Sequence, residues 1–435
     1  MKQNIHVKAP GNWVNDPNGF IYYKGMYHLF YQHFPYAPRW GTMHWGHAVS
    51  KDLVHWEHKG LALIPTKRED QNGCFSGSAV ECDGKMQIFY TGVRYETPDP
   101  ENIHLCLNDQ LVSSQLRIAS EDGFHFDNFH DKQIIIPEMT DPEIGDRTHT
   151  RDPKVWRGQD AWYMVLGSTD RRKSGKLLFY KSEDLHEWKY VNQATTDEKL
   201  GWMWECPDYF ETDGAQVLIF SPMGITEDGK KYKDQAVCTC VKFEEKTCSM
   251  EIPDSFQFLD YGLDLYAPQS TLDEEGRRMM IAWLRMPELE EDTWNGMFCM
   301  PRVVEVKNGH IYFRLHPYLK KAFSRKIETV KQAASEGYCI SMELPEEGKI
   351  SVGGYQIQRK NGRIVTDRSN VFPELKEYRM QFESPEVRDG SHLDIYVDKN
   401  MIEIYINDGE YVISNAVYGL SEEIETKETY TLFTV

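Results

Sequence analysis

The strongest constraint on the fold is a short unit that recurs five times between Phe20 and Trp283. Each copy is an apolar strand, a turn with glycine and a second apolar strand, as in F-I-Y-Y-K-G-M-Y-H-L-F-Y. A second signature follows three of the hairpins, as S-K-D-L-V-H-W, S-E-D-G-F-H-F and S-E-D-L-H-E-W. Two repeats in phase predict an all-β fold, a five-bladed β-propeller. The turn glycines are Gly25, Gly84, Gly158, Gly214 and Gly276, and their spacings are 59, 74, 56 and 62 residues.

The character of the chain changes after residue 315. We expect the propeller, as the catalytic domain, over residues 1–315 and a partly helical linker over 316–337. Alternating segments such as L-D-I-Y-V-D and M-I-E-I-Y-I then return, with D-K-N and N-D-G as turn sequences. They predict a C-terminal β-sandwich over residues 338–435.

Composition excludes several classes of partner. The formal net charge is -19 and no long Lys/Arg run occurs, which argues against nucleic acid. No stretch approaches the length of a membrane span, and the first residues lack the apolar core of a signal peptide. The nine cysteines have no disulfide or zinc spacing. We therefore expect reduced thiols, a cytoplasmic location, no membrane contact and no metal or cofactor. The oligomeric state stays open, a homo-oligomer included.

The residues just before the five hairpins carry the chemistry. Their motifs are N-D-P-N-G, F-S-G-S, R-D-P, W-E-C-P-D and L-Y-A-P-Q, each six to ten residues before its turn glycine. Propeller symmetry would place them around one end of the axis. Three of them are acids, Asp16, Asp152 and Glu205, and clustered carboxylates are costly to bury without compensation. A functional site explains this arrangement better than a core does.

Two kinds of site could use three acids. A metal site lacks a histidine at ligand spacing, so we favour two catalytic carboxylates and a third that orients the substrate. Aromatic residues near the acids suit sugar rings, whose C–H faces are apolar. These aromatics are Trp13, Trp40, Trp45, Phe75, Trp202 and Trp204.

The motifs W-V-N-D-P-N-G, F-Y-Q-H-F-P, W-G-T-M-H-W-G, F-S-G-S-A-V, R-D-P-K-V-W and W-E-C-P-D resemble those of glycoside hydrolase family 32, the β-fructofuranosidases. The resemblance runs from about Pro10 to Glu305, with I-E-I-Y-I-N-D-G-E matching in the second domain. It implies the same propeller and sandwich. It further implies Asp16 as nucleophile, Glu205 as general acid/base and Asp152 as transition-state stabiliser. Residues implied to bind the substrate are Asn15, Gln32, Trp40, Phe75, Ser76, Arg151, Tyr266 and Trp283.

The resemblance implies hydrolysis of sucrose or short fructo-oligosaccharides by double displacement, with the two carboxyl groups roughly 5–5.5 Å apart. Glu205 should start protonated, and Asp16 should be held ionised by backbone N–H groups of a tight turn. The chain departs from the family pattern at Val14, where Met is common, and at Thr42, where Asn is common. Thr42 is expected near the leaving group, so it bears on substrate preference.

Four alternatives stay open. A sucrose-6-phosphate hydrolase would need cations at the rim of the active site to bind the phosphate group. The candidates are Arg39, Arg94, Arg171 and Arg172. A fructosyltransferase would use the same residues. An arabinan-cleaving hydrolase shares the architecture but lacks the N-D-P-N-G and E-C-P-D pair. A non-catalytic sugar-binding protein has no need of both Asp16 and Glu205.

Overall fold

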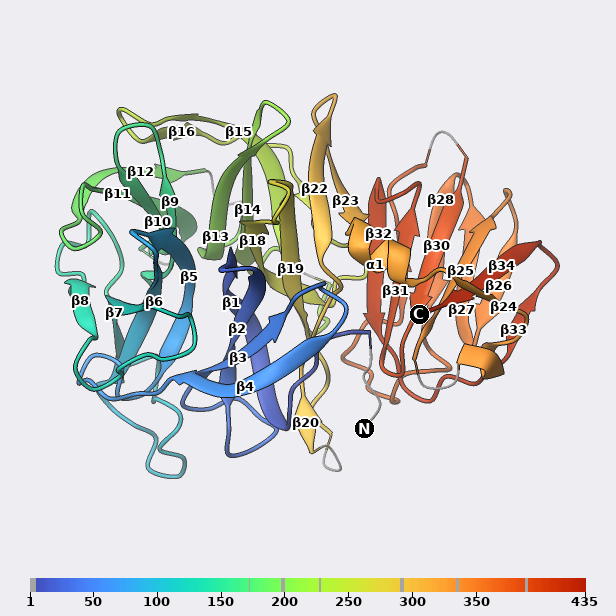
Figure 1. Ribbon diagram of the computed structural model, residues 1–435, viewed down its shortest axis with the longest axis horizontal. Coiled ribbons are helices and arrows are strands. Elements are labelled where there is room, and N and C mark those ends of the chain that lie inside the picture. Colours follow the sequence, from blue (N-terminus) through green and yellow to red (C-terminus); the bar gives the residue numbers. More distant parts are fainter. Residues whose placement is uncertain are drawn as a thin grey trace.

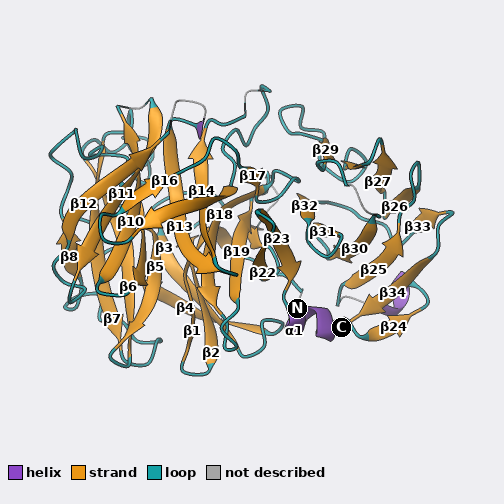
Figure 2. Cartoon of the chain, turned by 90° about the horizontal axis from the view of Figure 1, so that it is seen from above, coloured by secondary structure: helices purple, strands orange, loops and turns teal. Residues whose placement is uncertain are grey.

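The computed structural model describes residues 5–171, 173–196, 200–226, 228–289, 293–333, 336–387 and 390–435. Arg172, a candidate rim cation, lies outside them. The chain forms two bodies side by side, a ring of sheets and a smaller sandwich (Figure 1). Strands dominate both bodies (Figure 2). In the described part of the chain, no helix is long and apolar enough to cross a membrane.

Five sheets form the blades of the propeller, which confirms the predicted fold. Blade one has β1 (Asn12–Tyr23), β2 (Met26–Phe34), β3 (His44–Ser50) and β4 (Trp56–Leu63), with β20 (Trp294–Asn295) parallel to β1. Blade two has β5 (Cys74–Cys82), β6 (Lys85–Tyr95), β7 (Leu111–Ser120) and β8 (Gln133–Ile136). Blade three has β9 (Arg151–Arg157), β10 (Trp162–Asp170), β11 (Ser174–Ser182) and β12 (Lys189–Thr195).

The last two blades carry short extra strands. Blade four has β13 (Met203–Thr212), β14 (Ala215–Met223), β15 (Val237–Glu244), β16 (Ser249–Glu251) and β17 (Gln257–Phe258). Blade five has β18 (Leu265–Leu272), β19 (Arg278–Leu284), β21 (Met297–Phe298), β22 (Arg302–Lys307) and β23 (His310–Leu315). β1, β5, β9, β13 and β18 contact one another in sequence around the axis, so they are the inner strands.

Each inner strand is irregular at the same place. The pairing register shifts between Val14 and Pro17 in β1, and at the corresponding points of β5, β9, β13 and β18. Such bulges re-aim side chains and occur preferentially beside active sites. In three strands the bulge holds a non-glycine residue with positive φ directly before a proline, at Asp152, Cys206 and Ala267. These are strained positions, which cluster at functional sites. N-D-P-N-G is therefore a bulged strand, and the predicted tight turn is wrong.

The second repeat signature is a turn. The hydroxyl of its serine accepts a hydrogen bond from the backbone N–H three residues on, at 2.9 Å in all three copies. The aspartate also accepts from nearby backbone N–H groups, as Asp122 does from Phe124 and His125. Asp52 and Asp184 do the same. The repeat therefore ends the third strand of a blade, and its acids are structural.

The second body is a sandwich of two sheets, as predicted. One sheet holds β24 (Arg325–Ile327), β34 (Tyr430–Thr434), β25 (Tyr338–Glu343), β30 (His392–Val397), β31 (Met401–Ile406) and β32 (Tyr411–Ala416). The other holds β29 (Gln381–Glu383), β28 (Arg363–Asp367), β27 (Tyr355–Lys360), β26 (Lys349–Val352) and β33 (Ile424–Thr426). The helix α1 (Pro317–Ala322) and the 3-10 helix η2 (Val330–Ala333) lie between the two bodies in the sequence.

A buried polar network joins the two bodies. Arg302 donates to Asp260 of the propeller at 2.9 Å and to Glu403 of the sandwich at 2.8 Å. Glu403 also contacts His6 at 2.8 Å, so the N-terminal segment is tied into the interface. Arg368 pairs with Asp264 across the same interface. Because removing one partner would leave a buried charge unpaired, this network fixes how the two bodies pack.

Candidate active site

Asp16 lies in the bulge of β1, and its side chain is surrounded by donors from neighbouring strands. Ser76 of β5 donates to Oδ2 at 2.5 Å, and Gln32 of β2 donates to the same oxygen at 3.1 Å. Asn15 donates to Oδ1 at 3.0 Å and is itself oriented by Trp13, whose Nε1 donates to Asn15 at 2.8 Å. The predicted backbone donors are therefore replaced by side chains, because in a bulged strand the carboxylate faces across the sheet.

Glu205 lies at the bulge of β13. Nε and Nη2 of Arg151 donate to its Oε1 at 3.0 and 2.8 Å. The hydroxyl of Tyr266 donates to Oε2 at 2.6 Å and also lies 3.2 Å from the carbonyl oxygen of Ser221. Arg151 therefore fixes Oε1, whereas the Tyr266 hydroxyl lies between Oε2 and Ser221 and can donate to either oxygen. The starting proton that we predicted on Glu205 stays a prediction.

Asp152 is linked to Asp16 through Cys206, the residue that follows Glu205. Its Oδ2 accepts from the backbone N–H of Cys206 at 2.9 Å. The Cys206 thiol lies 3.6 Å from this oxygen and 3.5 Å from Oδ2 of Asp16. Burial, together with the charges of Asp152 and Asp16, raises the pKa of Cys206 well above its usual range. Cys206 therefore stays a thiol that bridges Asp16 and Asp152, and it makes no hydrogen bond to Glu205 among the described contacts.

The three carboxyl groups perturb one another. Burial is the largest cause that raises the pKa of Asp16; the charge of Glu205 also raises it, while the Ser76 hydrogen bond lowers it. Burial likewise raises the pKa of Asp152 to about 7, against the opposing charge of Arg151 and with the charges of Glu205 and Asp16. Strongly perturbed acids packed together in a cleft are typical of active sites.

The aromatic residues divide into a rim and a core. Trp40 and Phe75 meet edge to face at 5.9 Å, and Trp13 and Trp283 at 5.8 Å, in one cluster beside Asp16. Trp202 packs against His149 at 5.1 Å. Trp45 and Trp204 are completely buried in the hydrophobic core, so the expectation that they face a sugar is wrong.

One charged residue was missed. Lys154, two residues after Asp152, donates to Asp208 at 2.9 Å and to the carbonyl oxygen of Ser270 at 2.7 Å. Asp208 also accepts from the backbone N–H of Ser270 at 2.6 Å. The cation that pairs with Asp208 is therefore Lys154. One indication of this pair was present in the sequence: R-D-P-K and E-C-P-D occupy equivalent positions in neighbouring repeats.

The rim cations are mostly paired. Arg94 lies 3.5 Å from Glu138, and Arg171 lies 2.8 Å from Glu143. Arg39 is exposed in the loop just before Trp40.

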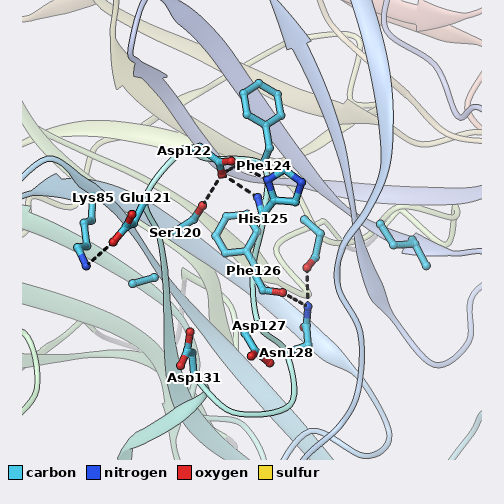
Figure 3. A pocket seen from close by; sticks show the side chains of 13 residues that line it. Lys85, Ser120, Glu121, Asp122, Phe124, His125, Phe126, Asp127, Asn128 and Asp131 are labelled. Carbon is cyan, nitrogen blue, oxygen red and sulfur yellow. Dashed lines mark hydrogen bonds and ion pairs between the residues drawn. The ribbon is translucent and has the colours of Figure 1, made fainter.

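A separate cavity of about 750 Å³ lies at the other end of blade two (Figure 3). Its wall includes Asp122 and Asp127, which accept hydrogen bonds in turns, and Glu121, which pairs with Lys85 at 3.1 Å. These acids are engaged in structural contacts. Among the described residues, no three His, Cys, Asp or Glu side chains group as metal ligands, here or beside Asp16.

Two half-buried carboxylates on inner strands, a buried third that Cys206 bridges to Asp16, and aromatic side chains beside them define a candidate glycosidase site. The sequence profile of the glycosyl hydrolases family 32 N-terminal domain matches residues 6–317, and that of the family's C-terminal domain matches residues 339–434. The chain belongs to this family, as the resemblance predicted.

Characterised relatives span nearly the whole chain. A raffinose invertase of Escherichia coli is 33% identical over 95% of this chain and 89% of its own length. A sucrose-6-phosphate hydrolase of the same species is 33% identical over 97% and 90%. Among solved structures, a β-fructofuranosidase of Bombyx mori superposes with a TM-score of 0.83 at 28% identity, covering 98% of this chain and 92% of that one.

Proposed function

We propose that the chain is a retaining β-fructofuranosidase, which hydrolyses the terminal β-D-fructofuranosyl bond of sucrose or short fructo-oligosaccharides. The observation that carries this is the closeness of Asp16 and Glu205: Cys206, next to Glu205, contacts Asp16 at 3.5 Å, and the charge of Glu205 raises the pKa of Asp16. Membership of a β-fructosidase family supports the reaction class. A binding module would have no need for this arrangement.

In the proposed mechanism Asp16 attacks C2 of the fructosyl unit while Glu205 protonates the departing glycosidic oxygen. A fructosyl ester on Asp16 forms. Glu205, now ionised, takes a proton from water, which attacks C2 and releases fructose. Asp152 holds ring hydroxyls, and these bonds strengthen as positive charge develops on the ring.

In this mechanism the proton that Glu205 donates is carried by Oε2. Protonation at Oε2 requires Tyr266 to stop donating there, and the Ser221 carbonyl oxygen at 3.2 Å offers its hydroxyl another acceptor. Arg151 keeps Oε1 fixed through two hydrogen bonds meanwhile. The acid can thus gain and lose its proton without moving its carboxyl group.

The substrate-binding roles are part of the proposal. Asn15, Gln32 and Ser76 contact Asp16, while Arg151 and Tyr266 contact Glu205, so a sugar ring between the acids meets them. Trp40, Phe75 and Trp283 supply apolar faces. A cytoplasmic location is also proposed, supported by nine cysteines that are all free.

Steady-state kinetics test the proposal, with sucrose, 1-kestose and sucrose 6-phosphate as substrates. Asp16→Ala and Glu205→Ala should each lower kcat on sucrose by about a thousandfold or more. Glu251→Ala, which removes an exposed carboxylate paired with Lys242, is the control and should leave kcat unchanged. If Asp16→Ala kept more than about a thousandth of the activity, the nucleophile role would be untenable.

The named relatives make sucrose 6-phosphate the main rival substrate. A catalytic efficiency for it more than about tenfold above that for sucrose would favour the phosphate-specific activity on the same residues. Products formed in concentrated sucrose separate hydrolysis from fructosyl transfer.

A further inference from the structure

The loop between β6 and β7, residues 96–110, stands at the active-site end of blade two. Tyr95 pairs with Leu111 at the base of this loop, whereas Met86 pairs with Ser120 at the far end of the same hairpin. Cys74 of the inner strand pairs with Gly92, so Phe75 and Ser76 lie at the same end as the loop. The loop therefore lies at the same end of the propeller as Phe75 and Ser76.

His104 is anchored through both its imidazole ring and its backbone. Its Nδ1 lies 2.9 Å from Oγ1 of Thr42, a position where the chain departs from the family pattern. Tyr95 donates to its carbonyl oxygen at 2.9 Å, and its backbone N–H donates to Asn102 at 3.1 Å. Phe34 meets the imidazole edge to face at 4.8 Å. The ring is held on several sides.

Beside His104 the surface is apolar and open. Tyr36 lies roughly parallel to the imidazole, with 22° between the planes and centroids 6.4 Å apart. Tyr36 and Ile103 are each 68% exposed, among the most exposed large apolar residues of the described chain. Phe34 belongs to the same cluster as Trp40 and Phe75, so this surface continues the aromatic rim outward from Asp16. Nε2 of His104 has no protein partner among the described residues.

The charge of the loop restricts what it can bind. It carries Glu96, Asp99, Glu101 and Asp109 and has no lysine or arginine. The nearby cation Arg147 is paired with Glu96 at 2.8 Å and with Glu138 at 3.2 Å. A phosphate dianion here would meet an excess of like charge, which is unfavourable, because these carboxylates outnumber Arg39, the exposed cation in the loop that carries Tyr36. A neutral sugar could pack its apolar C–H face on Tyr36 and hydrogen-bond a hydroxyl to Nε2 of His104.

We propose that Tyr36, Ile103 and His104, with His104 positioned by Thr42, bind the neutral leaving-group saccharide and favour unphosphorylated substrates. This rests on the proposed function. The surface adds contacts for sugar units beyond the fructosyl ring, so its contribution should be larger for a trisaccharide than for sucrose. This surface should affect KM through binding of the leaving group, and it should not affect kcat because it does not contact the carboxylates.

The test compares kcat and KM for sucrose, 1-kestose and sucrose 6-phosphate in the full chain. His104→Ala and Tyr36→Ala should each raise KM for 1-kestose about three- to tenfold, with a smaller rise for sucrose and kcat within about twofold. Thr42→Val removes the hydrogen bond while keeping the side-chain shape, and should reproduce part of the His104→Ala effect. His125→Ala, an exposed histidine at the other end of blade two, is the matched control and should change nothing.

Thermal melting of each variant checks that it folds, and Thr42→Val tests the surface with little change in side-chain volume. Unchanged KM values in folded variants would overturn the inference, as would an equal loss of kcat on every substrate. So would a wild-type preference for sucrose 6-phosphate of more than about tenfold. Each of these leaves the fructosidase activity in place, whereas a wild-type chain inactive on all three substrates would overturn the proposed function itself.

Discussion

Replacing Ser76 with alanine tests how Asp16 is kept ionised. Ser76 is buried, and its hydroxyl donates to Oδ2 of Asp16 at 2.5 Å. This bond lowers the pKa of Asp16 against the effect of burial, which raises it. A hydrogen bond to a charged group contributes about 1.5–3 kcal/mol, and one pKa unit corresponds to about 1.4 kcal/mol. Its loss should therefore raise the pKa of Asp16 by about one to two units.

The assay is the pH dependence of kcat/KM for sucrose. In the proposed mechanism Asp16 reacts as a carboxylate, so the rate should fall as the pH drops through its pKa, and a higher pKa should move this acidic limb to higher pH. We expect an upward shift of about one unit, near the lower bound, because Gln32 still donates to Oδ2 at 3.1 Å.

Ser120→Ala removes a buried serine at the far end of the same blade and is the control. An acidic limb that stays in place in an active Ser76→Ala enzyme would refute the reasoning, since the hydrogen bond would then have no bearing on the ionisation of Asp16.

Two further predictions concern stability. Burial lowers the pKa of His6, but hydrogen bonds to Asp398 and Glu403 outweigh it and raise the pKa to about 9. The stability that protonated His6 contributes should be complete below about pH 6.5 and disappear as the pH rises through 9. Urea unfolding should show this loss in the wild type and not in His6→Gln; parallel pH profiles would contradict it. At Gly77 an added Cβ would lie 1.9 Å from the carbonyl oxygen of Phe89, whereas at Gly11 it would meet nothing within 4 Å. Gly77→Ala should cost more than about 2 kcal/mol of unfolding free energy, and Gly11→Ala little; equal melting temperatures would argue against the close approach of β5 and β6.

The fold could be predicted because its signal is local and repeated. Each hairpin is recognisable in the sequence by a glycine turn between two apolar strands. The Ser-x-Asp turns follow three of these hairpins in the same order. The motifs of the candidate site could be predicted because they also repeat: Asp16, Asp152 and Glu205 each lie at the bulge of an inner strand.

The partners of these acids were harder to predict because they come from other strands. The expectation of backbone donors at Asp16 failed because the sequence does not reveal that N-D-P-N-G continues as a bulged strand, which turns the carboxylate toward Gln32 and Ser76. Trp45 and Trp204 were misjudged for a similar reason. Closeness to an acid along a strand does not say which face a side chain takes, and both point into the core.

The most direct test of the proposed chemistry is to find the fructosyl group on the enzyme. Wild-type protein mixed rapidly with sucrose, quenched in acid and digested should yield a peptide containing Asp16 with one added hexosyl residue, and the Asp16→Ala protein should yield none. A hexosyl residue on the peptide containing Glu205, or on no peptide while turnover proceeds, would contradict the double displacement through Asp16.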